Sequence, residues 1–476
     1  MIRVKPDKNQ FILFPNPFDE HLDLNNRWVK FSQKIPWDKI EHHYTIRMDK
    51  GMGTIAKDSR LVVGALIIKH HENLSDEATI QAISENLYMQ YFVGLPSFSK
   101  EQIFTPSLFV EIRKRLGADY WSVINELIIE HNQPNKDEDP PTLSQNQGTI
   151  NIDATIVEQD ITYPTDLKIL NDSREKLEEI IDVICLKTHQ TKPRTYRRVA
   201  RRDFLNTAKK KNCSYKEIRK SNGKQLSYVY RNLKHVDNLL AGRINLTNLL
   251  NRHQLKYLQV IQTVFEQQHY MHKNRTNKVS DRIVSIHQPH VRPMVRGKAG
   301  SPVEFGSKIG ITIHDGLTFL DTLSWNNYNE ADDLKISAEN YFRRNNRYPA
   351  KINADQKYMT RENRNWCKER GIHLAGKPLG RSSKLKKEEQ QNELRKSASE
   401  RNCVEGKFGQ AKRRYSMDNI KARLQATSES MIGAIVVVLN LIRLVQQHVH
   451  YFVKLIYFLL REFYQKKFVV FLKPTF

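Results

Sequence analysis

Residues 149–157, TINIDATIV, are the stretch that decides the fold, because the chain changes there from helical patterns to strand patterns. Apolar and polar side chains alternate at a period of two residues, as in a strand with one buried face. The apolar positions are Ile150, Ile152, Ala154 and Ile156, and the polar positions are Asn151, Asp153 and Thr155. The pattern predicts a strand that carries Asp153 on the face opposite the apolar side chains.

The sequence that follows this strand is first helical and then strongly basic. Residues 166–186 have helical spacing, and residues 192–220 carry twelve Lys and Arg side chains but only two acidic ones, Asp203 and Glu217. Helical candidates continue to about residue 272. Tyr196, Phe204 and Tyr215 lie among the cations. The run therefore predicts either a track for DNA or a pair of solvated basic helices.

Strand patterns return at residues 282–287. A hairpin is expected next, with strands at 303–313 and 317–323 joined by Asp315-Gly316, a turn dipeptide. Helices are expected at 330–344 and 361–370, strands at 349–355 and 372–375, and mainly helix after that. This order predicts a mixed α/β fold with the basic helical block inserted after the first strand.

The first 130 residues predict a mostly helical domain. Helices are expected at 59–70, 76–90, 111–115 and 121–129, the second entered through Ser75 as its N-cap. The break at residues 71–74 suits a helix-turn-helix, although any helical bundle has short turns. Residues 131–148 are polar and rich in Pro, Asn and Gln, so we expect a linker.

The net charge indicates which class of partner the protein binds, and the cysteines indicate the redox state of its compartment. The 476 residues have a formal net charge of +25, which favours a polyanionic partner because Lys and Arg release counterions from phosphates. A positive charge that only keeps the protein soluble, or a ribosomal or membrane-surface role, would also explain this excess. The four cysteines form no CxxC pair. We expect reduced thiols in a cytosolic protein.

Neither end of the sequence predicts a membrane segment. The N-terminal MIRVKPDKNQ lacks the apolar core of a signal peptide. The apolar runs 431–442 and 449–460 are shorter than the roughly 18–20 residues that span a bilayer. We expect buried core helices and no membrane partner.

Three carboxylates lie where such a sheet could bring them together: Asp153 in the first strand, Asp355 at the end of a later strand, and Glu405 on a late helix. Carboxylates are the hard oxygen ligands that Mg²⁺ and Mn²⁺ prefer, and two such ions about 4 Å apart promote phosphoryl displacement. Other candidates for the same site are Asp160, Asp166, Asp315, Asp321, His287 and His290. Of these, Asp315 fits the hairpin turn better, and Asp321 is a possible supporting carboxylate.

The helix around Glu405 is the most informative segment. Arg401 precedes Glu405 by four residues and Lys412 follows it by seven, so the three share one helical face. Val404, Phe408, Ala411 and Tyr415 form an apolar stripe beside it. The pattern predicts a helix that packs by one stripe and presents a charged stripe at the edge of the core.

The segment resembles the signature of the DDE insertion-sequence transposases of the group-five superfamily, which is Arg, three residues, Glu, six residues and Lys. Ile152-Asp153-Ala-Thr, Tyr163-Pro-Thr-Asp-Leu, Asn353-Ala-Asp355 and the segment from Ser75 to Leu95 are also similar to that family. The likeness covers nearly the whole chain. One departure is Ala398, where the family often has a Tyr three residues before the Arg.

The resemblance implies a ribonuclease H-like catalytic core, formed by residues 149–165 and 281–476, with a basic helical insertion at 166–280. An all-α DNA-binding domain, residues 1–130, and the linker 131–148 precede it. Asp153, Asp355 and Glu405 would hold Mg²⁺ or Mn²⁺, with two ions expected. Arg401 and Lys412 would contact the phosphates of transposon ends, and the basic block predicts further DNA contacts at Arg197, Arg198, Arg201 and Arg202.

The expected function is a transposase that binds terminal inverted repeats, cleaves DNA and transfers the strand to a target. Because two ends must be brought together, we expect a homodimer on double-stranded DNA, in the cytoplasm of a prokaryote. Two alternatives stay open: a catalytically silent repressor or domesticated transposase, and a nuclease of the same core that performs no strand transfer.

Overall fold

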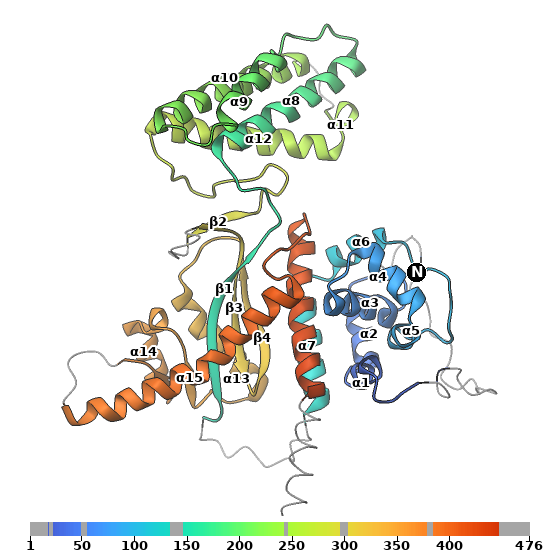
Figure 1. Cartoon of the computed structure of the whole chain (residues 1–476), viewed down its shortest axis with the longest axis vertical. Coiled ribbons are helices and arrows are strands. Elements are labelled where there is room, and N and C mark those ends of the chain that lie inside the picture. Colours follow the sequence, from blue (N-terminus) through green and yellow to red (C-terminus); the bar gives the residue numbers. More distant parts are fainter. Residues whose placement is uncertain are drawn as a thin grey trace, which may run out of the picture.

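The computed structural model describes residues 18, 22–48, 55–133, 146–241, 246–295, 303–377 and 384–446. Figure 1 shows a curled sheet with helices on both sides, a group of N-terminal helices beside it, and a helical bundle beyond one end of β1. The predicted mixed α/β layout is present, although most of the described residues are helical.

β1 (Thr149–Glu158) lies at the centre of the sheet. It pairs antiparallel with β3 (Val303–His314) on one side and parallel with β5 (Lys351–Asn353) on the other, and β5 pairs parallel with β6 (His373–Ala375). On its other edge, β3 pairs antiparallel with β4 (Leu317–Ser324) and, nearer its start, with β2 (Arg292–Val295). The strand order is therefore β2-β3-β1-β5-β6, with β4 also paired to β3.

The predicted first strand and hairpin are confirmed. Asp315 and Gly316 join β3 to β4 with φ of 52° and 79°, the left-handed pair that a two-residue hairpin turn of primed type requires. The strand predicted at residues 282–287 is wrong, because that segment has no ladder partner. Its apolar residues are buried in other contacts: Ile283 and Ile286 pack on the insertion, and Val284 packs near Trp325.

The two faces of the sheet are covered differently. Ile150 and Ile152 of β1 pack with α13 (Asp333–Asn345) and α14 (Arg361–Glu369). The opposite face of β1 and β3 contacts α15 (Lys384–Tyr415) and the N-terminal helices. Asp153 belongs to this second face, because its partner in β3 is Ile311 and successive side chains alternate across a sheet.

The N-terminal segment is helical, as predicted. Its helices are α1 (Arg27–Gln33), α2 (Trp37–Ile46), α3 (Ser59–Glu72), α4 (Asp76–Glu85), α5 (Leu87–Phe92), α6 (Ser107–Arg115) and α7 (Ala118–Asn132). Ser75 caps α4 through the Ala78 N–H at 3.0 Å. The helix predicted at 76–90 is broken at Asn86, whose side chain accepts from the Met89 N–H and begins α5. Of the predicted linker, residues 134–145 lie outside the described residues.

The helix Gln425–Gln446 joins the N-terminal helices to the sheet. The Trp121 indole on α7 donates to the Ser430 hydroxyl at 2.9 Å, and Asn440 donates to the β4 carbonyl of Thr318 at 2.6 Å. One apolar core therefore runs from Trp28 to Leu444. By length and composition this is the one described helix that could cross a membrane, but 78% of its most apolar window is buried, as expected of a core helix. The predicted run 449–460 lies outside the described residues.

The basic block forms a bundle between β1 and β2 in sequence. Its helices are α8 (Asp166–Thr188), α9 (Arg197–Ala208), α10 (Tyr215–Leu240), α11 (Leu246–Leu249) and α12 (Arg252–Asn274). The bundle has its own core, which includes Leu177, Ile181, Val229 and Ile261. Capping boxes at Ser214 and Asn251 begin α10 and α12. A separate core means that the bundle's shape is set by its own helices and not by the sheet.

Candidate functional site

Asp153 and Asp355 reach the same edge of the sheet because β1 and β5 are parallel and in register. Asn151 pairs with Asn353, and each Asn is followed two residues later by one of the two aspartates. Asp355 lies just beyond β5, where its carboxylate accepts from the Gln356 N–H at 2.7 Å and from Arg401 at 3.1 Å. The predicted convergence of these two carboxylates is present in the structure.

The Asp153 carboxyl is half-buried and accepts a hydrogen bond from the Ala154 N–H at 2.9 Å. Burial raises its pKa above the ordinary value. The Ala154 N–H and the Arg401 guanidinium oppose this rise, whereas the nearby charges of Glu330 and Asp355 add to it. Several carboxylates close together at this partly buried edge of the sheet favour the binding of a cation.

Glu405 is joined to this pair through Arg401 and not directly. One terminal nitrogen of Arg401 lies 3.1 Å from Asp355, and the other lies 4.0 Å from Glu405. The Glu405 side chain is 63% exposed. Within the described part of the chain, no three His, Cys, Asp or Glu side chains lie close enough together to hold a metal ion. Asp153 and Asp355 therefore lie at one edge of the sheet, and Arg401 lies between Asp355 and Glu405.

A buried polar network fastens α15 to the sheet just before these acids. The Asn353 amide donates to Asn151 at 2.9 Å and to Glu400 at 2.8 Å, and its oxygen accepts from Ser397 at 2.8 Å. Lys351 also contacts Glu400, at 2.8 Å. This network was not predicted from the sequence. The repeated Asn-x-Asp in two strands was the available signal, since both Asn side chains share the face of the aspartates.

Glu330 is a further acid near Asp153, and its sequence pattern predicted only the start of a helix. It begins a 3-10 turn, η1 (Glu330–Asp332), and its carboxylate contacts Lys308 at 3.0 Å and Lys357 at 3.3 Å. Nothing in the local pattern distinguishes it from a surface residue. Its place near the aspartates depends on β3 and η2 (Gln356–Tyr358), which carry the two lysines.

The other candidate acids and histidines have different surroundings. The Asp321 carboxylate accepts a hydrogen bond from Thr312 of β3, and Thr312 pairs with Ile152 of β1, so Asp321 lies on the face of the sheet opposite Asp153. The Asp321 side chain is fully buried and also accepts from Asn340 at 3.1 Å. Asp315 lies in the hairpin turn, and Asp166 forms an ion pair with Arg282. His290 packs against Trp325. Asp160 and His287 line a pocket together with Lys168 and Arg423.

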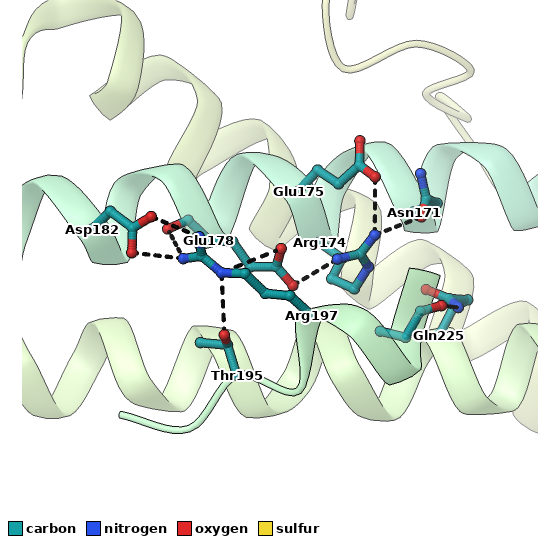
Figure 2. Close-up of polar contacts among 9 residues, drawn as sticks. Asn171, Arg174, Glu175, Glu178, Asp182, Thr195, Arg197 and Gln225 are labelled. Carbon is teal, nitrogen blue, oxygen red and sulfur yellow. Dashed lines mark hydrogen bonds and ion pairs between the residues drawn. The ribbon is translucent and has the colours of Figure 1, made fainter. Parts of the chain in front are cut away.

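The predicted DNA-contacting arginines fall into two groups. Arg198, Arg201 and Arg202 are exposed on α9, and none of them makes an ion pair with another described residue. Arg197 differs, because its guanidinium bonds twice to Asp182 of α8, at 2.6 and 2.7 Å (Figure 2). Lys412 is half-buried on α15.

Comparison with known proteins gives matches at both ends of the chain. A transposase DDE domain model matches residues 352–442, a range that holds Asp355, Arg401, Glu405 and Lys412, and a transposase domain model, DUF772, matches residues 16–115. An uncharacterised protein of Rhizobium meliloti, ORF8 in the nfe locus, is 26% identical over 165 residues, which are 35% of this chain and 77% of that protein. No solved structure matches. One transposase model thus matches the N-terminal helices, and the other matches the segment that carries Asp355 and Glu405, so the chain is similar to DDE-domain transposases in both regions.

Proposed function

We propose that this protein binds the terminal inverted repeats of an insertion sequence, cleaves the DNA there and joins the freed end to a target. Transposases act on DNA, and DDE-domain members generally use divalent metal ions. The observation that carries the proposal is the pair Asp153 and Asp355 at one edge of β1 and β5, with Asp355 in contact with Arg401 of α15. The strand order β2-β3-β1-β5-β6, with β4 also paired to β3 and with β3 antiparallel, supports a ribonuclease H-like core.

The residues at this edge fit a divalent cation. Asp153 and Asp355 offer the hard carboxylate oxygens that Mg²⁺ and Mn²⁺ prefer, and the crowded negative charge around Asp153 favours a cation. We assign Glu405 as the third ligand, with two ions expected. Bound there, such ions would activate an oxygen nucleophile and stabilise the leaving oxygen of a phosphodiester.

The positive residues have a separate role in this proposal. Arg401 and Lys412 share the face of α15 that carries Glu405, so a DNA end placed at the acids would have its phosphates beside them. Arg198, Arg201 and Arg202 on the insertion would hold DNA further along its backbone. Such contacts add affinity without reading sequence.

A nicking assay tests the catalytic part. The protein is incubated with a labelled duplex from the end of its element, with Mg²⁺ and with EDTA, beside Asp153→Asn, Asp355→Asn and Glu405→Gln. Asp315→Asn is the matched control, because this carboxylate is 80% exposed in the hairpin turn and Asn also adopts a left-handed backbone. We expect nicking only by the wild type and the control, and only with Mg²⁺. Nicking by the three site variants at the wild-type rate would refute the assignment.

One observation favours a second candidate, a DNA-binding repressor without chemistry. Arg401 already compensates the charge of Asp355 and lies beside Glu405, and no three-ligand cluster is present among the described residues. A protein that retards the element-end duplex in a gel but never nicks it with Mg²⁺ or Mn²⁺ would support this candidate over the first.

The remaining proposals concern organisation. We assign residues 1–130 to end recognition, 131–148 to a linker, 149–165 and 281–476 to the catalytic core, and 166–280 to the inserted bundle. Because two ends must be joined in one reaction, we expect a homodimer on DNA, in the cytoplasm of a prokaryotic cell. Sedimentation of the protein with and without an element-end duplex measures whether a homodimer forms on DNA.

A further inference from the structure

α9 carries the three free arginines, yet little apolar packing holds it in place. Ala200 is its single buried residue. Its N-cap, Tyr196, makes no side-chain capping bond and has φ of 56°, a left-handed conformation that costs a non-glycine residue about 1–2 kcal/mol. The orientation of this helix therefore depends on polar contacts with its neighbours.

Arg197 makes the most extensive of these contacts. Its two terminal nitrogens donate to Asp182 at 2.6 and 2.7 Å and to the Glu178 carbonyl at 2.8 Å, and its Nε donates to the Thr195 hydroxyl at 3.3 Å. Figure 2 shows this side chain lying along α8, in line with Glu178 and Arg174. A bidentate arginine–carboxylate pair fixes both distance and orientation.

The acceptors are themselves anchored in the bundle. Glu178 binds Arg174 at 2.6 Å, and Arg174, which is 1% exposed, also donates to Asn171 at 2.8 Å. Burial alone would raise the pKa of Asp182, but hydrogen bonds from Arg197 and Lys192 lower it, so this carboxylate is ionised at neutral pH. The ion pair thus joins the first residue of α9 to Asp182, a partly exposed residue of α8 that lies one turn after the buried Glu178.

Other contacts tie α9 to α10. The Gln225 amide donates to the Ala200 carbonyl at 3.0 Å, and Lys224 and Tyr228 bind Asp203 at 3.2 and 3.0 Å. These contacts lie along the opposite side of the helix from Arg198 and Arg202. With Arg197 held on α8 and Asp203 held on α10, the side of α9 that carries Arg198 and Arg202 is left exposed.

We propose that Arg197 is a positioning residue, whose ion pair with Asp182 orients α9 so that Arg198, Arg201 and Arg202 face the DNA backbone. Arg197 itself contacts no phosphate. This inference rests on the proposed DNA binding by the insertion, and it separates one arginine from three that look equivalent in the sequence.

For Asp182→Asn, a positioning role predicts weaker binding to DNA, whereas net charge alone predicts tighter binding. Asp182→Asn makes the protein more positive, which by itself strengthens binding to DNA. If α9 loses its orientation, binding becomes weaker, by about tenfold for the loss of one charge-assisted contact. Glu179→Gln is the matched control: it removes a carboxylate from the same helix, one that pairs with Lys176 and does not hydrogen-bond to α9.

The experiment measures affinity for an element-end duplex of about 30 base pairs, by fluorescence anisotropy over a range of salt concentrations. The variants are Asp182→Asn, Glu179→Gln, Arg202→Gln, Arg197→Glu, and the charge-swapped pair Arg197→Glu with Asp182→Arg. We expect Asp182→Asn, Arg202→Gln and Arg197→Glu to bind more weakly, Glu179→Gln to bind as the wild type or more tightly, and the swapped pair to recover most of the loss. If the swapped pair binds as weakly as Arg197→Glu alone, Arg197 contacts phosphate and the proposal is overturned.

Hydrogen exchange of the free protein separates failure of this inference from failure of the proposed function. Faster exchange in α9 of Asp182→Asn, with the rest of the bundle unchanged, shows that the ion pair orders the helix. Unchanged exchange in α9 overturns the positioning role. A wild type that binds no duplex refutes DNA binding by the insertion, whatever the exchange of α9.

Discussion

Asn353→Ala is the substitution that best tests how the site is assembled. The Asn353 side chain is fully buried and makes three hydrogen bonds, to Asn151, Glu400 and Ser397. A neutral hydrogen bond contributes about 1 kcal/mol to stability, and one to a carboxylate about 2 kcal/mol. We expect the free energy of unfolding to fall by about 3–4 kcal/mol, and nicking to fall by about 100-fold because Arg401 and Glu405 are carried by the helix that loosens.

Urea denaturation followed by tryptophan fluorescence measures the stability, and hydrogen exchange in α15 shows whether the loss is local. Ser397→Ala removes one of the three bonds and is expected to cost about 1 kcal/mol. Asn402→Ala is the control, because this asparagine is exposed on the same helix. If Asn353→Ala unfolds within about 0.5 kcal/mol of Asn402→Ala, a difference typical of surface substitutions, α15 is not held at β5.

Two further predictions concern the N-terminal helices. Asp76→Asn removes a half-buried carboxylate that binds Arg113 twice, at 2.7 Å, and should cost about 3 kcal/mol in urea denaturation, whereas the exposed Asp119→Asn should cost under about 1 kcal/mol. Although burial opposes it, Arg113 lowers the pKa of Asp76, so this stabilisation is present above the ordinary pKa of about 4 and is lost as pH falls through the lowered value. Gly433→Ala would place a Cβ 2.6 Å from that of Trp121, and overpacking should lower stability by about 1–3 kcal/mol; an unchanged melting temperature would argue against close packing of these helices.

The parts of the fold that could be predicted from sequence are those with local causes. The period of two residues in β1, the Asp-Gly turn and the Ser75 cap each act within a few residues, and each is present in the structure. The strand prediction at residues 282–287 was wrong because an apolar run shows that side chains are buried but not what covers them. The break at Asn86 was missed because a capping asparagine inside a helical pattern looks like any other polar residue.

The same distinction applies to the site. The convergence of Asp153 and Asp355 follows from a general rule, since the ends of neighbouring parallel strands meet at one edge. The place of Arg401 between Asp355 and Glu405 depends on how far α15 lies from the sheet, which helical spacing alone does not give. Likewise, no pattern separates Arg197 from Arg198; only the presence of Asp182 on the neighbouring helix does.

The acids of this site are held by two different kinds of support. Asp153 and Asp355 are fixed by backbone pairing of β1 with β5, which a single side-chain substitution disturbs little. Glu405 and Arg401 are held through the side chains that dock α15, which are apolar residues such as Val404 and the hydrogen bonds of Asn353. A change in that docking therefore separates Glu405 from the two aspartates without moving the sheet. Because each group is needed for strand cleavage in our proposal, substitution of a residue that docks α15 should lower nicking strongly, although such a residue touches neither DNA nor metal.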